Sequence, residues 1–225
     1  MELYIDSAEI EKIKHLTEWL PIDGITVNPS IISKNKTPLF ELLKQLLPLS
    51  KKFLHVQVLS NKKEDIMLEA QTLHNISEKI VVKIPATKEG LSAIKEIDTE
   101  KITITATAVF SVTQALISAK AGAKYIAPYV SRINRIEQSG TLLVKEIKET
   151  VCNIYKYPVK IIAASVKSSY EVKELLNIGV DAVTLSPEIM YESCTHFLTD
   201  QAVAMFTADW EKTFKELKLD SELKL

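Results

Sequence analysis

Short apolar segments rich in β-branched residues alternate with segments of helical periodicity along the whole chain. Each apolar segment has the length of a strand that is buried on both faces, and turn residues separate it from the next helical stretch. Strands that alternate with helices in this way are typical of a parallel sheet. The eight predicted strands lie at about 3–6, 25–29, 53–59, 80–86, 102–109, 125–130, 160–166 and 182–186.

The segments between these strands carry apolar residues at three- and four-residue spacing, which places them on one face of a helix. Such a face is expected to pack against the outside of the sheet. The clearest examples are Ile10, Ile13, Leu16 and Leu20 near the N-terminus, and Leu143, Ile147, Val151 and Ile154 between residues 137 and 155.

Serines and glycines mark the expected helix boundaries. A serine hydroxyl can cap the free N–H groups where a helix begins, and a glycine suits the left-handed turn that ends one. No linker rich in Pro, Ser or Gly interrupts the pattern, so a single domain over residues 1–225 is expected. The serines are Ser7, Ser111 and Ser168, and the glycines are Gly24, Gly122 and Gly179.

Eight β/α units could form an open doubly wound sheet or a closed barrel. The dinucleotide signature G-x-G-x-x-G is absent, and five glycines in 225 residues leave little room for loops that cradle phosphates. The pattern therefore favours an α/β fold of the single-domain (β/α)8 TIM-barrel type.

Composition excludes several classes of function. The 28 basic and 29 acidic residues give a net charge of −1, so no basic stripe is available for nucleic acid. The N-terminus does not resemble a signal peptide, and no apolar run approaches the ~20 residues that span a bilayer. Cys152 and Cys194 lack metal-ligand spacing and the four histidines are scattered. We expect a cytoplasmic protein with reduced cysteines and no metal site.

Each predicted strand ends in a polar residue, where the chemistry of a parallel barrel collects. Any one of these residues could simply begin a loop, but eight together, with acid, amide, amine, phenol and hydroxyl groups, favour a site. They are Asp6, Asn28, Gln57, Lys83, Thr107, Tyr129, Ser165 and Ser186. Two residues earlier, the side chains predicted to face the barrel interior are Tyr4, Thr26, His55, Val81, Thr105, Ala127, Ala163 and Thr184.

Lys83 is the most informative of these polar residues because it interrupts the apolar run IVVKIPA. An exposed edge strand would explain such a lysine, but a closed barrel has no edge strands. Burial disfavours the charged ammonium and favours the neutral amine, which can attack a carbonyl to form an imine. The cationic imine then accepts electrons during C–C cleavage, and Asp6, Tyr129 and a water held by Gln57 are candidates for proton transfer.

Four segments resemble the small transaldolase family: ITVNPSII (25–32), IVVKIPATKEGLSAI (80–94), FSVTQALISAKAGAKYIAPYVSRI (110–133) and AASVKS (163–168). The likeness runs through essentially the whole chain. It implies a class I aldolase barrel that needs no metal or organic cofactor. It also implies that Lys83 is the Schiff-base lysine and that Asp6 transfers a proton at the cleaved bond.

The resemblance implies further roles for residues around this lysine. Gln57, Thr107 and Tyr129 would hold the catalytic water, with Tyr129 as its acid/base partner. Thr26 and Asn28 would contact the hydroxyls of a dihydroxyacetone unit. A third group, Arg132 and Ser165 with Lys167, would bind the sugar phosphate, for which a guanidinium fork is well suited.

Within the family, Gln57, Thr105 and Tyr129 resemble the fructose-6-phosphate aldolase branch. This branch splits fructose 6-phosphate reversibly into dihydroxyacetone and glyceraldehyde 3-phosphate. A transaldolase, which passes the dihydroxyacetone unit to another sugar phosphate, is the alternative, followed by an aldolase for a different sugar and by a non-enzymatic scaffold. Two departures from the aldolase pattern, His55 and Ser131, leave the preferred substrate open.

Residues from about 199 to 217 predict a C-terminal helix, within an extension at about 199–225 and with Thr199 and Asp200 as possible caps. Its apolar stripe could pack against the chain's own barrel or against a neighbouring copy. The resemblance implies the second, because family members form rings, commonly pentamers or decamers. The stripe consists of Val203, Phe206, Trp210, Phe214 and Leu217.

Overall fold

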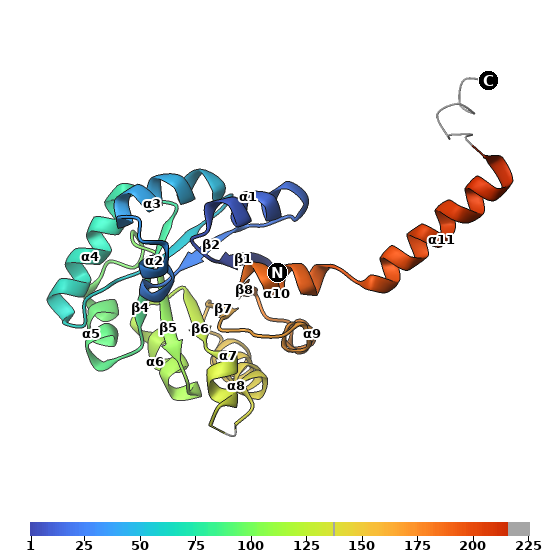
Figure 1. The fold of residues 1–225 in the computed structure, drawn as a ribbon. Coiled ribbons are helices and arrows are strands. Elements are labelled where there is room, and N and C mark those ends of the chain that lie inside the picture. Colours follow the sequence, from blue (N-terminus) through green and yellow to red (C-terminus); the bar gives the residue numbers. More distant parts are fainter. Residues whose placement is uncertain (137, 216–225) are drawn as a thin grey trace.

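The computed structural model describes residues 1–136 and 138–215 and shows a closed barrel of eight parallel strands (Figure 1). The strands follow each other around the barrel in sequence order, and β1 pairs with β8 to close it. All eight predicted strands are confirmed, with ends shifted by a few residues. They are β1 (Glu2–Asp6), β2 (Gly24–Val27), β3 (Leu54–Gln57), β4 (Ile80–Pro85), β5 (Ile104–Val109), β6 (Tyr125–Pro128), β7 (Lys160–Ala163) and β8 (Ala182–Leu185).

Helices surround the barrel, and the main apolar core lies between them and the strands. This arrangement confirms the predicted TIM barrel with an additional C-terminal helix. The helices are α1 (Ile10–Trp19), α2 (Pro29–Asn35), α3 (Leu39–Leu46), α4 (Lys63–Ile76), α5 (Lys88–Glu96), α6 (Val112–Ala121), α7 (Val130–Asn134), α8 (Gly140–Ile147), α9 (Ser169–Ile178), α10 (Pro187–Cys194) and α11 (Phe197–Phe214). A 3-10 turn covers Leu47–Leu49 and a π-helix covers Lys148–Ile154.

The predicted apolar faces pack against the barrel, with one exception. Ile13 and Leu16 of α1 are buried, as are Ile147 and Val151 in the second example. Ile154, however, is 62% exposed. The helix continues beyond α8 as a π-helix, whose wider turns change the direction of successive side chains. The three- and four-residue spacing therefore no longer holds Ile154 on the buried face.

Four of the six predicted helix boundaries are confirmed. Ser111 and Ser168 accept hydrogen bonds from backbone N–H groups at the starts of α6 and α9, and Gly122 and Gly179 end these helices with φ of 116° and 73°. Ser7 accepts from the N–H of Glu9, but α1 begins only at residue 10, so this serine is not its cap.

Gly24 does not end a helix, contrary to the prediction, but begins strand β2. A Cβ atom here would lie 2.0 Å from the carbonyl oxygen of Phe53 and 2.9 Å from a ring carbon of Tyr4. Glycine is required because backbone and aromatic ring approach this position closely inside the barrel.

A smaller core fills the barrel interior and contains three of the predicted inward residues, Tyr4, Val81 and Ala127. On β7 the inward residue is Ile162, whereas the predicted Ala163 belongs to the outer core. Ala163 was predicted to point inward because it lies two residues before Ser165, on the assumption that the strand continues to Ser165. The strand ends at Ala163, however, and Ser165 has a left-handed φ of 57°, so the alternation does not extend that far.

Charged and phenolic side chains close the N-terminal end of the barrel around Glu2. Its carboxylate accepts hydrogen bonds from the hydroxyls of Tyr4 (3.0 Å) and Tyr125 (3.2 Å) and pairs with Lys160 at 2.8 Å. Burial alone would raise the pKa of Glu2, but the hydrogen bonds from Lys160 and the tyrosines outweigh it and lower the pKa below 4.5. The carboxylate is therefore more stable in the folded protein than in the unfolded chain.

We expect Glu2→Gln to reduce the free energy of unfolding by about 1–3 kcal/mol, because Lys160 loses its buried counter-charge. Since the folded pKa is lowered, the stability from ionised Glu2 is present above pH 4.5 and disappears as the pH falls through the folded pKa. Urea unfolding at pH 7 and at pH 3 measures both effects, and the deficit of the variant should shrink at pH 3. Glu11→Gln, which alters the exposed pair with Lys14, should cost less than about 1 kcal/mol. Equal losses in the two variants would contradict this assignment.

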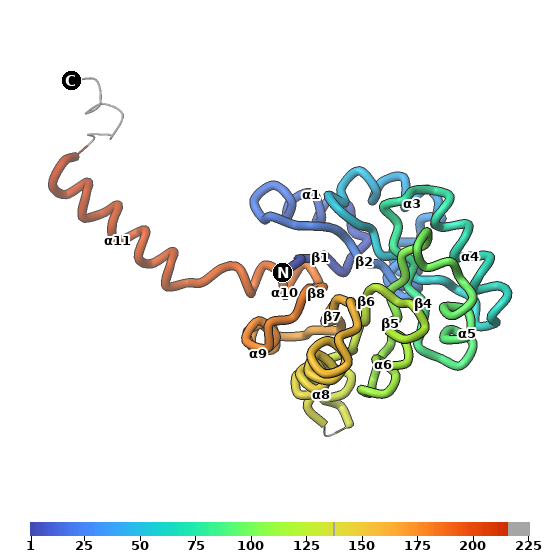
Figure 2. The backbone as a smooth tube through the Cα atoms, turned by 180° about the vertical axis from the view of Figure 1, so that it is seen from behind, coloured from blue at the N-terminus to red at the C-terminus, as the bar shows by residue number. Residues whose placement is uncertain are grey.

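Helix α11 extends away from the barrel in both views (Figures 1 and 2). Among its described residues none is buried, and Val203 and Phe206 are 57% and 63% exposed. The helix begins at Phe197, where the ring of His196 accepts a hydrogen bond from a backbone N–H, so Thr199 and Asp200 are not its caps. The alternative that the stripe packs on the chain's own barrel is therefore wrong for the described residues. Leu217, the last residue of the predicted stripe, lies outside them.

Candidate active site

A cavity of about 290 Å³ opens at the C-terminal ends of the strands. Seven of the ten predicted site residues line it, although they come from segments far apart in the sequence. The closed barrel brings these segments together because parallel strands all end at the same face. The seven residues are Asp6, Asn28, Lys83, Tyr129, Arg132, Ser165 and Lys167.

Lys83 projects from β4 into the barrel and reaches the cavity while remaining only 4% exposed. Its strand neighbours in register are Gln57 of β3 and Thr105 of β5. Among the residues that the structure describes, no carboxylate lies within 4.0 Å of its amine. The amine is therefore enclosed by protein, open to the cavity and without a paired carboxylate, as a carbonyl nucleophile requires.

The carboxylate of Asp6 is oriented by two threonines inside the barrel. The hydroxyl of Thr26 donates to Asp6 at 2.6 Å and lies 2.6 Å from the hydroxyl of Thr184. Because Thr26 uses its single proton for Asp6, Thr184 is the donor in the second bond. Thr26 is buried and does not line the cavity, so the structure places it behind Asp6 rather than against a substrate.

Gln57, Thr107 and Tyr129 form a second polar group next to Lys83. The Thr107 hydroxyl lies 3.4 Å from the Tyr129 hydroxyl, and Thr107 is fully buried. The amide oxygen of Gln57 is buried without a hydrogen-bond partner among the described residues. Buried polar atoms in proteins are normally satisfied, so this oxygen is available for a water or a substrate hydroxyl. Gln57 and Thr107 are not among the residues that line the cavity.

The loops after β6 and β7 are joined by backbone hydrogen bonds. The N–H groups of Val130 and Ser131 donate to the carbonyls of Ala164 (2.9 Å) and Ser165 (3.0 Å). These bonds hold α7, which carries Arg132, beside Ser165. The Arg132 guanidinium also lies 4.8 Å from the centre of the Tyr129 ring. The predicted phosphate-binding residues therefore occupy one side of the cavity.

Ser131, one of the two departures noted in the sequence, lines the same cavity and is held by Glu171. Its hydroxyl donates to the carboxylate of Glu171 at 2.9 Å. The same carboxylate accepts from the side chain of Asn134 (2.7 Å) and from the backbone N–H of Lys167 (2.7 Å). Ser131 therefore fixes the loop that carries Lys167.

His55, the other departure, is fully buried below the cavity. Its Nδ1 lies 2.9 Å from the Thr105 hydroxyl, and its ring packs edge-on against Tyr4 and Tyr125. Burial, assisted by the nearby charge of Lys83, holds the pKa of His55 well below its usual value of 6.5. The imidazole is therefore neutral at physiological pH.

Sequence reasoning missed four polar or charged residues of the cavity wall. Ser30 and Lys34 lie on α2, Ser131 lies on α7, and Arg135 directly follows α7. Of these, only Ser131 was mentioned in the sequence analysis, as a departure from the aldolase pattern and not as a site residue. The only available signal was position, because each residue lies on, or directly after, a helix that follows a site strand. Ser186, the polar residue predicted for β8, caps α10 and lines an adjoining hollow instead.

Neither a metal site nor a membrane span is apparent in the described part of the chain. No group of three or more His, Cys, Asp or Glu side chains there could hold a metal ion. No described helix is long and apolar enough to cross a bilayer.

The fold alone is shared with solved barrels of low sequence identity. A thiamine phosphate pyrophosphorylase from Pyrococcus furiosus matches with a TM-score of 0.61 at 17% identity, over 85% of this chain and 93% of that chain. The inosine 5′-monophosphate dehydrogenase of Legionella pneumophila matches with a TM-score of 0.56 at 15% identity, over 84% of this chain and 59% of that chain. The protein is thus a (β/α)8 barrel with a polar cavity at the face where barrel enzymes have their active sites.

Sequence comparison identifies the family. The profile described as "Transaldolase/Fructose-6-phosphate aldolase" matches residues 3–221, and the chain belongs to this family. A "Probable transaldolase" of Aquifex aeolicus is 40% identical over 212 residues, covering 94% of this chain and 97% of the relative. A protein of the same description from Kosmotoga olearia is 37% identical over the same shares of both chains. The protein is therefore an enzyme of the transaldolase/fructose-6-phosphate aldolase family.

Proposed function

We propose that Lys83 forms a Schiff base with the carbonyl of a ketose phosphate and that the protein cleaves the adjacent C–C bond. The observation that carries the proposal is the buried amine at the base of a cavity that Asp6 and Tyr129 also line. The unprotonated form of a lysine amine adds to carbonyls, and the resulting iminium accepts the electrons of the breaking bond. A hydroxyl group on the second carbon away from the carbonyl is the substrate feature that this chemistry requires.

The steps use the residues in a definite order. The Lys83 amine adds to carbon 2 of the ketose, and loss of water gives the iminium. Asp6 then takes the proton of the carbon-4 hydroxyl as the bond between carbons 3 and 4 breaks, which releases an aldehyde and leaves an enamine on Lys83. Carbon 3 of the enamine then takes up a proton or adds to a second aldehyde, which restores the iminium. The Gln57 amide, Thr107 and Tyr129 hold the water that is released when the iminium forms and that later hydrolyses it.

Transfer of the enamine to a second aldehyde, the transaldolase reaction, is the outcome that the relatives favour. The relatives from Aquifex aeolicus and Kosmotoga olearia are both described as probable transaldolases. These descriptions support the transaldolase interpretation, which the residues Gln57, Thr105 and Tyr129 favour less than the aldolase.

Release of free dihydroxyacetone, the aldolase reaction, is the second candidate. It is favoured by the amide of Gln57 beside Lys83 and by the Thr107–Tyr129 contact of 3.4 Å. Both give the water a neutral environment. Incubation with fructose 6-phosphate, with and without erythrose 4-phosphate, separates the candidates. Product that depends on the acceptor indicates transfer, and free dihydroxyacetone without acceptor indicates release.

We expect Gln57→Glu to raise the ratio of transfer to release by about tenfold or more. The substitution keeps the shape of the side chain but places a carboxylate next to Lys83 and the water, which changes the proton transfer that ends the aldolase reaction. Both rates are measured on one enzyme preparation with the same donor. If the ratio does not change, Gln57 does not determine the fate of the enamine.

We expect Arg132→Ala to reduce kcat/KM for fructose 6-phosphate by about ten- to a hundredfold, because a charge-assisted contact contributes about 1.5–3 kcal/mol. Activity on unphosphorylated fructose should fall far less. Arg132→Lys keeps the charge but loses the guanidinium fork, and an intermediate loss is expected. Equal losses for fructose and fructose 6-phosphate would place the phosphate elsewhere.

A further inference from the structure

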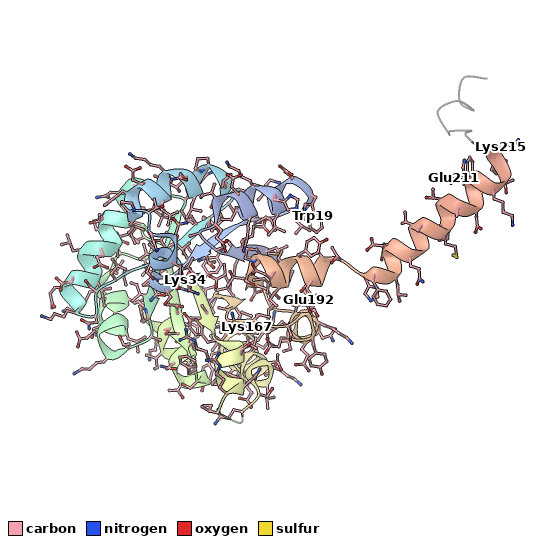
Figure 3. All side chains as sticks on the ribbon, in the orientation of Figure 1. Trp19, Lys34, Lys167, Glu192, Glu211 and Lys215 are labelled. Atoms are coloured by element: carbon pink, nitrogen blue, oxygen red, sulfur yellow. The ribbon has the colours of Figure 1, made fainter. Side chains whose placement is uncertain are left out.

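One half-buried carboxylate, that of Glu171 near the start of α9, accepts hydrogen bonds from two other segments of the site. Its donors are the hydroxyl of Ser131 (2.9 Å), the side-chain amide of Asn134 (2.7 Å) and the backbone N–H of Lys167 (2.7 Å). Ser131 and Asn134 belong to α7, which follows β6. Figure 3 labels Lys167, which lies between β7 and α9. Glu171 therefore joins α7 to the loop after β7, on the side of the cavity assigned to the phosphate.

Capping of its own helix explains only part of what Glu171 does. Ser168 and Glu171 stand at the first and last positions of a capping box, and the Ser168 hydroxyl accepts from the N–H of Glu171 at 3.2 Å. The bond from the N–H of Lys167 belongs to the same turn and fits this local role. Ser131 and Asn134, however, lie 40 and 37 residues away in the sequence. The carboxylate therefore also holds a second segment of the chain, which capping does not require.

Glu171 holds these segments without neutralising the cations that they carry. Within residues 1–136 and 138–215, no lysine or arginine nitrogen lies within 4.0 Å of its carboxylate. It binds Lys167 through the backbone and not through the ammonium group. On α7 it binds residues before and after Arg132, and not the guanidinium itself. The charges of Arg132 and Lys167, which both line the cavity, are therefore left for an anion.

The loop after β7 needs such a contact because its backbone is unusual. Backbone N–H groups at the start of α7 donate to the carbonyls of Ala164 and Ser165, where the two segments leave their strands. Ser165 has a left-handed φ of 57°, a conformation that is unfavourable for serine and that surrounding contacts must maintain. Glu171 supplies a contact two residues further along, at the N–H of Lys167. Loss of its carboxylate is therefore expected to loosen this turn and to leave the strands unchanged.

We propose that Glu171 is a positioning residue, whose carboxylate sets the spacing between Arg132 on α7 and Lys167 on the facing loop so that both bind one phosphate group. A phosphate monoester carries a charge of about −1.5 to −2 at neutral pH, which two cations from two segments match. Both contacts depend on distance, so a change in the spacing weakens at least one of them. The proposal rests on the proposed function, because it takes the substrate to be a sugar phosphate.

The test compares Glu171→Gln with Glu174→Gln, a matched control on the same helix. The Glu174 carboxylate accepts from the hydroxyl of Thr141 in α8 at 2.8 Å, so it also joins two segments, but outside the phosphate-binding loops. In Glu171→Gln, an amide N–H group replaces an oxygen where donors converge. We expect KM for fructose 6-phosphate to rise by about tenfold, the scale of one lost hydrogen bond to a charged group. The kcat should stay within about threefold, because the reacting groups are unchanged. Glu174→Gln should change neither constant by more than about twofold.

Two further probes locate the effect at the phosphate. With unphosphorylated fructose, Glu171→Gln should leave kcat/KM within about twofold, because this sugar makes no use of the positioned cations. Binding of inorganic phosphate to the Lys83→Met protein, measured by calorimetry, should weaken by about tenfold when Glu171→Gln is added. This readout is independent of turnover.

Asn134→Ala tests whether the effect passes through the carboxylate. Asn134 donates to Glu171 but is not among the residues that line the cavity. Its replacement should weaken phosphate binding less than Glu171→Gln does. In the double variant the two losses should not add, because both act on the same network. Additive losses would mean that Asn134 affects the phosphate by another route and that Glu171 is not the common link.

The outcomes distinguish this proposal from the proposed function. Equal effects of Glu171→Gln and Glu174→Gln on phosphate binding would refute the positioning role and leave the function intact. So would equal losses for fructose and fructose 6-phosphate, since these would indicate a general disturbance of the barrel. If no sugar were cleaved or trapped on Lys83, the proposed function would fail, while selective weakening of inorganic phosphate by Glu171→Gln would still support the positioning role.

Circular dichroism shows whether Glu171→Gln is folded. If it is not, Glu171→Asp takes its place, because aspartate keeps the charge but withdraws the carboxylate by one methylene. This variant should weaken phosphate binding and leave the kinetics with fructose unchanged. Phosphate binding equal to that of the wild-type residue in the folded Glu171→Asp protein would overturn the proposal.

Discussion

Replacement of Lys83 by methionine is expected to lower turnover by at least about 10⁴-fold, the scale seen when a covalent nucleophile is removed. Methionine has a similar length and no amine, so no imine can form. The fold should persist, because the side chain is buried inside an apolar strand and has no carboxylate partner among the described residues. Lys83→Arg should be equally inactive, since the guanidinium does not act as a nucleophile.

Borohydride reduction in the presence of substrate is the direct measurement. The wild-type protein should gain the mass of one reduced sugar fragment, and peptide mapping should place it on Lys83. The control variant Lys44→Met replaces an exposed lysine on α3, and it should be labelled to the same extent as the wild-type protein. Labelling of Lys83→Met would mean that another lysine carries the chemistry. The absence of labelling in every protein would favour the scaffold alternative.

Removal of residues 199–225 is expected to change the state of assembly rather than the barrel. The exposed stripe of α11 includes Val203, Phe206 and Phe214, and burying a large apolar side chain contributes about 1.5–3 kcal/mol. Exposed apolar surface of this extent is typical of an interface. We predict a homo-oligomer, a ring pentamer or decamer, in which this helix contacts a neighbouring copy. The shortened protein should form smaller or aggregating species.

Light scattering and circular dichroism check this prediction together. The helical and strand signals of the barrel should remain while the molecular mass in solution decreases. A subtler variant, Val203→Asp with Phe206→Asp, should have the same effect. Gln201→Asp adds a charge to the face of α11 opposite Val203 and should leave the assembly unchanged. An oligomer of undiminished size after the deletion would show that the stripe is not an interface.

Much of this molecule could be predicted from sequence because its strands are buried on both faces. Such strands are continuous apolar runs, and all eight appear in the structure. A lone charge is conspicuous in this background, and Lys83 therefore stands out in the sequence alone. The polar residues at strand ends were equally accessible, since parallel strands must end at one face.

Local irregularities of the backbone account for most of the sequence-based predictions that the structure contradicts. The left-handed Ser165 breaks the alternation that predicted Ala163 as an inward residue. The π-helix turns Ile154 toward solvent. Gly24 lies where neighbouring strands approach each other closely, and it does not form a turn. None of these features has a periodic signature, because each depends on atoms that are distant in the sequence.

By itself, the sequence determined the barrel class, the buried lysine and most of the residues that meet around it. These properties follow from patterns that burial imposes on short stretches of chain. Only the tertiary structure decided that Lys34 and Arg135 reach the same cavity, that Thr26 acts on Asp6, and that α11 leaves the barrel. The physical reason is that helix side chains point toward or away from a site according to how the whole helix packs, and packing is a property of the closed barrel.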